Sequence, residues 1–308
     1  MPAERRRGMD QGHYVYSPLP ARPALAWPGG AALASWICLH LEYWELDPPK
    51  GSRRIPGIDG MWQIYFPDYR TQAHREYGNR IGFFRVRDAL RDADLKATVS
   101  VNAEVCRRYP HLVEACLHEG WEIAAGGTHA TRMLHAGMSE AQEVDYIEEC
   151  AAAVRAFTGK TPAGWIGQDF NESARTPALL ARHGFQYLAD WPNDEQPYWM
   201  NPPQPIVSVP QQTEWDDVTL LWMRQILTQR FPEIVIAGFE QLRADGARFP
   251  RSFVLNIHTW LLGQPHRIRY LREILQHMAD ANNVWHTSAG AIAGHFASVQ
   301  AAHFQETR

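Results

Sequence analysis

The stretch Ala31-Ala-Leu-Ala-Ser-Trp-Ile-Cys-Leu-His-Leu-Glu42 is almost continuously apolar and ends in polar residues. An apolar run of this kind is typical of a strand that is buried on both faces. Such strands belong to parallel sheets whose faces are covered by helices. The stretch therefore predicts one strand of a parallel sheet.

The chain that follows alternates between apolar strands and amphipathic helices. The clearest helix is capped by Ser139, where Gln142 completes a capping box, and stops at Gly159. Strands that alternate with helices indicate parallel βαβ units. We predict an α/β fold, an irregular (β/α) barrel of about seven parallel strands. The expected strands are 31–42, 97–101, 121–125, 163–167, 186–189, 206–209, 253–257 and 284–286, and the other expected helices are 82–93, 109–118, 174–183, 216–229, 234–246, 265–281 and 289–297.

Composition divides the chain into three parts. Residues 1–30 are punctuated by prolines, and we predict an N-terminal arm that straps over the domain. Residues 31–298 are predicted to form a single (β/α) barrel catalytic domain, and residues 299–308 a polar C-terminal tail. Residues 43–79 are rich in Pro, Gly and aromatic residues, and a loop of that length usually carries function.

Charge and composition exclude several classes of partner. The 308 residues are 45% hydrophobic, and 30 Lys and Arg face 34 Asp and Glu, giving a net charge of −4. The chain has no overall excess of positive charge, so its composition does not indicate a nucleic acid or an anionic membrane as a partner. The sequence has no transmembrane run, no export signal and no Cys-x-x-Cys pair. We expect a cytoplasmic protein that acts on a small molecule. We retain homo-oligomerisation as an alternative, because the loop at 43–79 could reach a neighbouring subunit.

The active site of such a barrel lies beyond the C-terminal ends of its strands. Side chains alternate along a strand, so His40 and Glu42 share one face at the first strand end. Asn256 and His258 share a face at a late strand end, and His258 is a candidate general acid or base. Glu42 is a candidate catalytic carboxylate, or it caps a loop or pairs with an arginine.

Other strand ends carry further candidates. The amides of Gly126 and Gly127 could stabilise an oxyanion, and His129 is either an acid or base or a structural hydrogen bonder. The acidic cluster around Asp216 and Asp217 is predicted to cap the helix that follows. No metal-binding motif such as His-Glu-x-x-His is present. A flat polar ligand could be held by Asn102, Trp165, Gln168, Asp190, Trp191 and Asp194.

Several stretches resemble a known family. They include Asp190-Trp-Pro-Asn-Asp-Glu-Gln-Pro-Tyr198 and Ile257-His-Thr-Trp-Leu-Leu-Gly-Gln-Pro-His-Arg267. Together with residues 16–23, 27–30, 68–69, 77–85, 97–103, 120–125, 137–140 and 158–165, they make the chain similar to the polysaccharide deacetylase superfamily. Within it, the chain resembles the divergent branch of cofactor-independent allantoinases and cyclic-imide hydrolases.

The resemblance implies an incomplete metal site. Metal-dependent members have an Asp pair after the first strand and a His-[Ser/Thr]-x-x-His element after the third. This chain has Leu41-Glu42 at the first place, and Gly126 and Ala130 where the two histidines would stand. The resemblance also implies that His258 is the late-strand general acid, and it matches Asp190-Trp191 to the fifth-strand Asp-Trp element.

We therefore expect a hydrolase of a non-peptide carbon–nitrogen bond in a small cyclic amide, imide or ureide. Glu42 would act as general base and His258 would protonate the leaving nitrogen, with His129 or the glycine amides on the oxyanion. Asp194 and Gln168 would orient the ring between Trp165 and Trp191. No cofactor is expected. The alternatives are a metal-dependent deacetylase with zinc on Glu42, His129 and His258, and a non-catalytic barrel that binds a small ligand.

Overall fold

The apolar stretch forms strand β1 (Leu33–Leu41), and every one of its residues is buried. The structure is a computed structural model that describes residues 10–49, 52, 67–201 and 203–306, with side chains described up to residue 300. On one side β1 pairs with β2 (Thr98–Val101) and on the other with β8 (Arg251–His258). The start of β1 also pairs with β9 (Val284–His286). The predicted strand thus lies inside the sheet.

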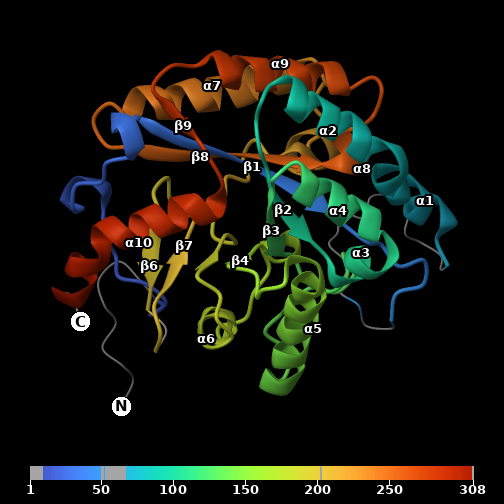
Figure 1. Cartoon of the computed structure of the whole chain (residues 1–308), viewed down its shortest axis with the longest axis horizontal. Coiled ribbons are helices and arrows are strands. Elements are labelled where there is room, and N and C mark those ends of the chain that lie inside the picture. Colours follow the sequence, from blue (N-terminus) through green and yellow to red (C-terminus); the bar gives the residue numbers. More distant parts are fainter. Residues whose placement is uncertain (1–9, 50–51, 53–66, 202, 307–308) are drawn as a thin grey trace.

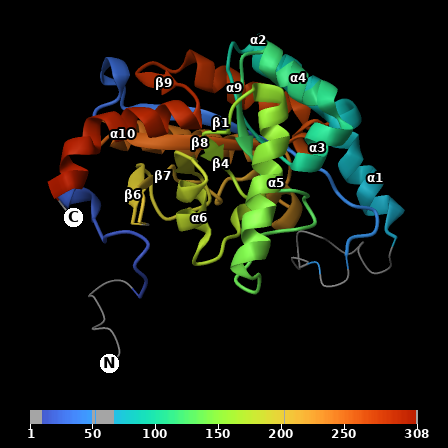
Figure 2. The same ribbon diagram turned by 60° about the horizontal axis from the view of Figure 1, so that its bottom comes forward.

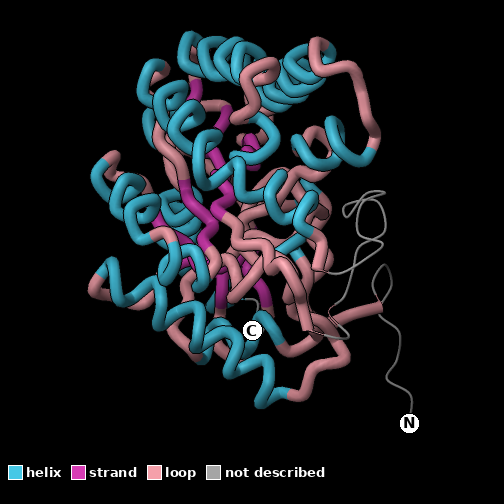
Figure 3. Tube along the Cα trace, turned by 90° about the vertical axis from the view of Figure 1, so that its right-hand side faces the viewer, coloured by secondary structure: helices cyan, strands magenta, loops and turns pink. Residues whose placement is uncertain are grey.

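The sheet curls into a half-barrel, as Figures 1 and 3 show. Its order is β6-β7-β5-β4-β3-β2-β1-β8, with β9 beside β1. Every pairing is parallel except that of β6 with β7, so the predicted irregular parallel barrel is confirmed. The strands not yet bounded are β3 (Glu122–Ala125), β4 (Gly164–Trp165), β5 (Tyr187–Leu188), β6 (Tyr198–Met200) and β7 (Ile206–Ser208).

Helices cover the outside of this sheet, and Figure 1 shows α7 and α9 side by side along β8 and β1. Figure 2 shows α10 near β6 and β7. Among the described residues, no helix is long and apolar enough to cross a membrane. The helices are α1 (Tyr69–Tyr77), α2 (Phe83–Asp92), α3 (Ala103–Arg108), α4 (Pro110–His118), α5 (Glu140–Thr158), α6 (Thr176–Arg182), α7 (Arg230–Asp245), α8 (Thr259–Leu262), α9 (Ile268–Asp280) and α10 (Ala289–Glu306), with π-helical turns at Gly78–Gly82 and Val218–Met223 and 3-10 turns at Leu19–Ala21, Pro28–Gly30 and Gln168–Phe170.

Several elements differ from the prediction. The end of the expected loop at 43–79 is helix α1, whose buried face is Thr71 and Arg75 rather than an apolar stripe. The rest of that loop lies largely outside the described residues. The expected helix 216–229 is only a π-helical turn, and strand β6 and the short helix α8 were not predicted. Prolines on both sides of β6 hide its pattern. The last helix continues past residue 297 to Glu306.

The side chains of β1 alternate between two buried clusters. Leu33 and Leu39 pack in the cluster that includes the covering helices α2, α7 and α9. Trp36 and Cys38 belong to a second cluster, which includes Ile292 of α10. Because the period of a strand is two residues, His40 and then Glu42 continue the second row beyond its apolar part.

The N-terminal segment lies against the barrel. Trp27 is buried, packs against the rings of Trp285 and His295, and donates its Nε1–H to the carbonyl of Arg251. Arg22 binds both carboxylate oxygens of Asp194. These contacts fix the part of the arm that the structure describes.

The carboxamide of Gln212 lies against β8, which is one end of the described sheet. Its Oε1 accepts the Val254 N–H at 2.7 Å, and its Nε2 donates to the Ser252 carbonyl at 2.8 Å. Both contacts have the geometry of good hydrogen bonds. Gln212 therefore does for this part of β8 what a neighbouring strand would do.

Candidate active site

The in-register pairing of β1 with β8 places His40 opposite His258 at the strand ends. Their rings stack, with centroids 4.2 Å apart and an interplanar angle of 1°. Glu42 follows two residues after His40, and its Oε1 lies 4.0 Å from His258 Nε2. The structure thus brings three strand-end candidates together: His40, Glu42 and His258.

Glu42 is a buried carboxylate that is held on both oxygens. Its Oε1 accepts the Gln168 Nε2–H at 2.8 Å, while Oε2 accepts the indole N–H groups of Trp44 and Trp260, each at 3.2 Å. Burial alone would raise the pKa of Glu42. His258, His40 and the Gln168 hydrogen bond outweigh burial and hold that pKa below its usual value. The side chain is therefore ionised near neutral pH.

His258 is clamped by a carboxylate that lies 41 residues earlier in the chain. Its Nδ1–H donates to Asp217 Oδ1 at 2.7 Å, and its backbone N–H donates to Asp217 Oδ2 at 2.8 Å. Burial would lower the pKa of His258, but Asp217 and Glu42 outweigh it and raise this pKa to about 10. The ring is an imidazolium whose Nε2 faces Glu42.

Asp217 was predicted to cap a helix, and that role is wrong. Both of its carboxylate oxygens serve His258, and the residue is fully buried. Asp216 does cap the following turn, because its Oδ1 accepts the Thr219 N–H at 2.9 Å. One acidic pair therefore has two separate tasks.

His40 is the neutral partner of the stacked pair. Burial and the charge of His258 lower the pKa of His40 to about 3. Its Nε2 lies 3.1 Å from Asn256 Oδ1 and, as the protonated nitrogen, donates to it. A charged ring and a neutral ring can stack without repulsion between two cations.

The structure engages one of the two glycine amides that were predicted to stabilise an oxyanion. The Gly126 N–H already donates to the Val101 carbonyl at 2.9 Å, so it is not available to a ligand. A Cβ on Gly127, which has a φ of +89°, would lie 2.2 Å from the Tyr146 hydroxyl oxygen. These glycines allow close packing. Asn102 donates to the Gly126 carbonyl at 2.8 Å and lies 3.4 Å from Gln168 Oε1, so it supports the residue that binds Glu42.

His129 lies away from the other two predicted catalytic residues. Its Nε2 is 3.9 Å from Glu45 Oε1, and its ring packs edge-on against Tyr43. No described contact joins it to Glu42 or His258. Burial lowers its pKa, so the ring is neutral near pH 7. The predicted oxyanion role, and a zinc site shared by these three residues, are not supported by this placement.

Unlike Gln168, the other predicted ligand-binding residues in this part of the chain have no described contact with Glu42; they are Trp165, Asp190, Trp191 and Asp194. Trp165 is fully buried in the core against Tyr146 and Phe185, so it is no exposed wall. Trp191 donates its Nε1–H to Glu172 and packs against Tyr14 of the arm.

Two acidic residues of the same group also have structural partners. Asp194 is bound by Arg22. Asp190 accepts the Gly167 N–H at 2.7 Å and so braces the turn that carries Gln168. Burial raises the pKa of Asp190 to about 7. Neither carboxyl orients a ring at Glu42.

Sequence reasoning missed several members of the group around Glu42. Arg75 lies over the ring of Trp260, with its guanidinium carbon 3.4 Å from the ring centroid, and over the rings of Trp44 and Trp222. Its charge contributes to the low pKa of Glu42. Asp169, next to Gln168, is another missed member. Trp260 lies two residues after His258, within the stretch 257–267 that carries the family resemblance. That position was the sequence signal for its place in the site.

A divalent metal finds a poor ligand set among the described residues. Asp216, Asp217 and His258 offer ligand atoms within 4.8 Å of one another. Both oxygens of Asp217 and Nδ1 of His258 are already joined by hydrogen bonds. A Cβ on Gly126 would lie 2.3 Å from Ser100 Oγ, so a histidine does not fit there. These residues do not fit a zinc site, which takes three or four protein ligands.

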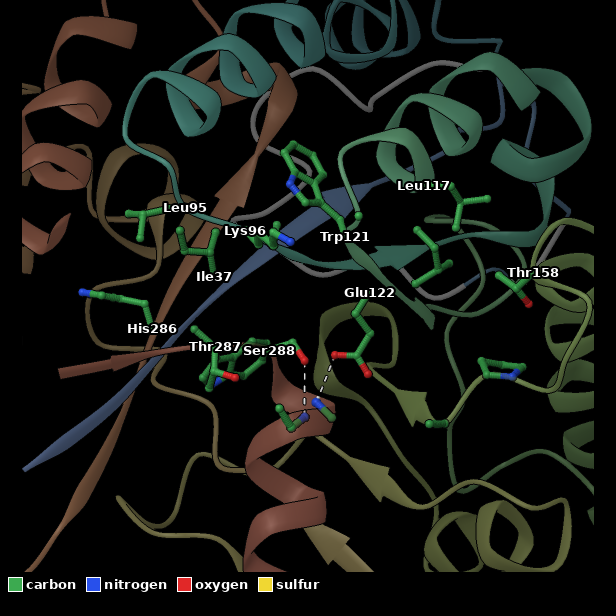
Figure 4. Close-up of a pocket in the computed structure, with 18 of the residues that line it drawn as sticks. Ile37, Leu95, Lys96, Leu117, Trp121, Glu122, Thr158, His286, Thr287 and Ser288 are labelled. Atoms are coloured by element: carbon green, nitrogen blue, oxygen red, sulfur yellow. Dashed lines mark hydrogen bonds between the residues drawn. The ribbon is translucent and has the colours of Figure 1, made fainter. Parts of the chain in front are cut away.

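A large cavity opens at the other end of the sheet. It has a volume of about 950 Å³, and its lining includes residues near the starts of several strands, among them Ala97. Glu122 at the start of β3 is labelled in Figure 4. Glu122 accepts the Gly290 N–H, and Ser288 accepts the Ala291 N–H, as the dashed lines show. The first turn of α10 is thus already capped. The cavity is separate from the residues around Glu42.

Comparisons with known proteins agree with this architecture. A profile described as polysaccharide deacetylase matches residues 78–188. A Schizosaccharomyces pombe protein named "Putative polysaccharide deacetylase" is 22% identical over 241 residues, which are 71% of this chain and 73% of that protein. The crystal structure of PuuE allantoinase is similar with a TM-score of 0.78 and 25% identity, over 90% of this chain and 94% of that one. The crystal structure described as "probable Polysaccharide deacetylase from Pseudomonas aeruginosa PAO1" has a TM-score of 0.78 and 24% identity, over 90% of this chain and 95% of that one.

A curled parallel half-barrel with a carboxylate and a histidine at its strand ends, together with these matches, defines a hydrolase of the deacetylase type. These matches support the polysaccharide deacetylase superfamily for this chain. The expectation raised by the resemblance of its sequence is thereby confirmed at the level of the superfamily.

Proposed function

We propose that the protein hydrolyses a carbon–nitrogen bond of a small cyclic amide, imide or ureide. One observation carries the proposal: an ionised carboxylate and an imidazolium face each other at strand ends, with Glu42 Oε1 4.0 Å from His258 Nε2. A water between them can hydrogen-bond to both, since hydrogen-bonded oxygens and nitrogens stand about 2.7–3.0 Å apart. The similarity to PuuE allantoinase supports a ring-opening reaction.

In the proposed reaction Glu42 takes a proton from water while the water oxygen attacks the carbonyl carbon. The resulting tetrahedral oxyanion lies near the positive charge of His258, which lowers its energy. His258 Nε2–H then protonates the ring nitrogen as the C–N bond breaks. The product is a ring-opened acid with a free amine, amide or urea end. The proton on Glu42 returns to His258 and restores both charges.

Asp217 and Gln168 have positioning roles in this scheme. Asp217 binds both the ring and the backbone of His258, so it fixes the orientation of Nε2. Gln168 donates to Glu42 Oε1, the oxygen that faces His258. The scheme has no step through a metal, because the ligand atoms nearest to His258 are already joined to one another.

The test is a turnover screen with succinimide, hydantoin, allantoin and N-acetylglucosamine, with and without a chelator. We expect ring opening that resists the chelator, and a fall in kcat of at least about a hundredfold in Glu42→Gln. Glu140→Gln, on the exposed start of α5, is the matched control and should keep wild-type turnover. Chelator-sensitive release of acetate, or full activity in Glu42→Gln, would overturn the proposal.

A further inference from the structure

Asp169 occupies a strained position beside the proposed general base. It lies in the turn after β4 and has a φ of +51°, and Phe170 after it has a φ of +55°. Residues other than glycine seldom adopt this conformation, and two in succession persist only when neighbours fix them. The turn is fixed by Asp190, which accepts the Gly167 N–H, and by the Phe170 N–H bond to the Gly167 carbonyl.

The turn brings the carboxyl of Asp169 to the same amide that holds Glu42. Gln168 Nε2 lies 2.8 Å from Glu42 Oε1 and 3.5 Å from Asp169 Oδ2. Glu42 is buried, whereas Asp169 is half-buried and keeps an exposed surface. Of the two carboxyls, Asp169 is therefore the one more open to a ligand.

Several titratable groups surround Asp169. Glu42 comes from the end of β1, His258 from β8, Asp216 from the turn before Val218–Met223, and Tyr146 from α5. Burial and the negative charge of Glu42 outweigh His258 and the Gln168 contact, and they raise the pKa of Asp169 to about 7. Below that pH the side chain is a neutral carboxylic acid with one O–H donor and one acceptor.

A neutral carboxylic acid is complementary to a cis amide. The acid presents O–H and C=O side by side, and a cis amide presents C=O and N–H on one edge, so two hydrogen bonds close an eight-membered ring. Small rings hold their amides cis. Acyclic secondary amides, including N-acetyl groups, are almost entirely trans and present only one of the two groups on a given edge.

We propose that Asp169 is the specificity-determining residue of this site and that its carboxylic acid pairs with the cis-amide edge of a cyclic imide or ureide. The inference rests on the proposed function, because the pairing sets the ring beside Glu42. An imide or ureide ring has a second carbonyl, which stays free for attack while the first is bound. A simple lactam has only one carbonyl, so the same pairing would occupy the group that must react.

Two variants of Asp169 distinguish loss of the hydrogen-bonded pairing with substrate from disruption of the fold. Asn tolerates a positive φ and offers an N–H donor and a C=O acceptor without titrating, whereas Gly tolerates the φ and offers neither. We expect Asp169→Asn to keep kcat/KM for succinimide within about threefold. Asp169→Gly should raise KM at least about tenfold, the cost of one unpaired polar group, with a smaller change in kcat.

The pH profile gives a readout that a structural role would not move. Wild-type kcat/KM should fall above about pH 7 as Asp169 loses its proton. Asp190 and Asp216 also have raised pKa values, about 7 and about 6, so the assignment depends on the variant. Asp169→Asn should abolish the fall. A profile that is unchanged in Asp169→Asn, or an unchanged KM in Asp169→Gly, would overturn the inference.

Binding to an inactive protein distinguishes this inference from the proposed function. In the Glu42→Gln background, calorimetry should detect succinimide and 2-pyrrolidinone, which both present a cis-amide edge, more strongly than the trans amide N-methylacetamide, and Asp169→Gly should remove the difference. If this pattern appears while no ring compound is hydrolysed by the wild type, the inference stands and the proposed reaction fails. If ring opening occurs but all three ligands bind alike, the reaction stands and the inference fails.

Discussion

The imidazole rings of His40 and His258 lie parallel at 4.2 Å, yet their pKa values move in opposite directions. The pKa of His40 falls to about 3, and that of His258 rises to about 10. Both rings are buried, so their partners decide the difference. Asp217 binds His258, whereas His40 faces the neutral amide of Asn256. The stack therefore holds one positive charge, on the ring that faces Glu42.

Removing the Asp217 carboxylate should change the charge of His258. We expect Asp217→Asn to lower the pKa of His258 toward the ordinary value near 6.5 and to reduce kcat by at least about a hundredfold at pH 8. NMR titration of the His258 ring protons measures the pKa directly. Glu240→Gln, which breaks the surface pair with His277, is the control and should leave this titration unchanged. A His258 that still titrates near 10 in Asp217→Asn would contradict this prediction.

Stability should depend on pH through the same two rings. The folded-state pKa of His258 is raised, so its contribution is complete below about pH 6.5 and is lost as the pH rises toward about 10. The pKa of His40 is lowered, so its contribution is lost as the pH falls from about 6.5 toward 3. One proton gives a slope of at most about 1.4 kcal/mol per pH unit.

Urea unfolding of the wild type and of His258→Gln between pH 6 and 9.5 tests the alkaline part. The free energy of unfolding of the wild type should fall more steeply with pH, because only the wild type loses the favourable proton on His258. Parallel pH dependences in the two proteins would show that His258 is not the group responsible. His277→Gln, on the surface of α9, is the matched histidine control.

Introducing a histidine at residue 126 should not create a metal site. A Cβ there would meet Ser100 Oγ at 2.3 Å and the Val101 nitrogen at 3.1 Å, so Gly126→His should destabilise the fold by at least about 1–3 kcal/mol. Gly294→Ala, in an open part of α10, should instead stabilise by about 1 kcal/mol. Chemical denaturation and metal analysis check both variants. Stoichiometric zinc in a stable Gly126→His protein would refute this reading.

Asp194 should matter for the arm and not for the substrate. Its pair with Arg22 is bidentate, and the two side chains are only 14% and 18% exposed. Arg22→Ala and Asp194→Ala should each lower the unfolding free energy by about 1 kcal/mol and leave KM unchanged. The exposed pair of Arg230 with Glu233 is the control, with an effect of about 0.5 kcal/mol or less. A rise in KM in Asp194→Ala alone would return this residue to the binding site.

The sequence predicts the centre of the fold well because its signals are local. Residues 31–42 and 253–257 are apolar runs, and side-chain alternation together with the strand-end rule selects His40, Glu42 and His258. The structure brings these three together. Nothing beyond a period of two residues and the direction of parallel strands is needed for that prediction.

Other predictions depended on information that is not local. Alternation cannot be extended to His129, because Gly127 has a positive φ and turns the chain away from the strand direction. Trp165 lies on a strand of two residues, too short for alternation to indicate its face. Asp217 precedes a π-helical turn and reaches His258 from 41 residues away, and no periodic pattern marks such a contact.

The carboxamide of Gln212 has a consequence for how the half-barrel avoids polymerising. An open sheet exposes backbone N–H and C=O groups that can recruit a strand from another molecule, which is a common route to aggregation. Gln212 occupies the Val254 N–H and the Ser252 carbonyl, and the Glu195 carbonyl takes the Ser252 N–H. Side-chain and loop groups thus cap this edge, so the sheet can remain open here without offering these groups as a template for edge-to-edge association.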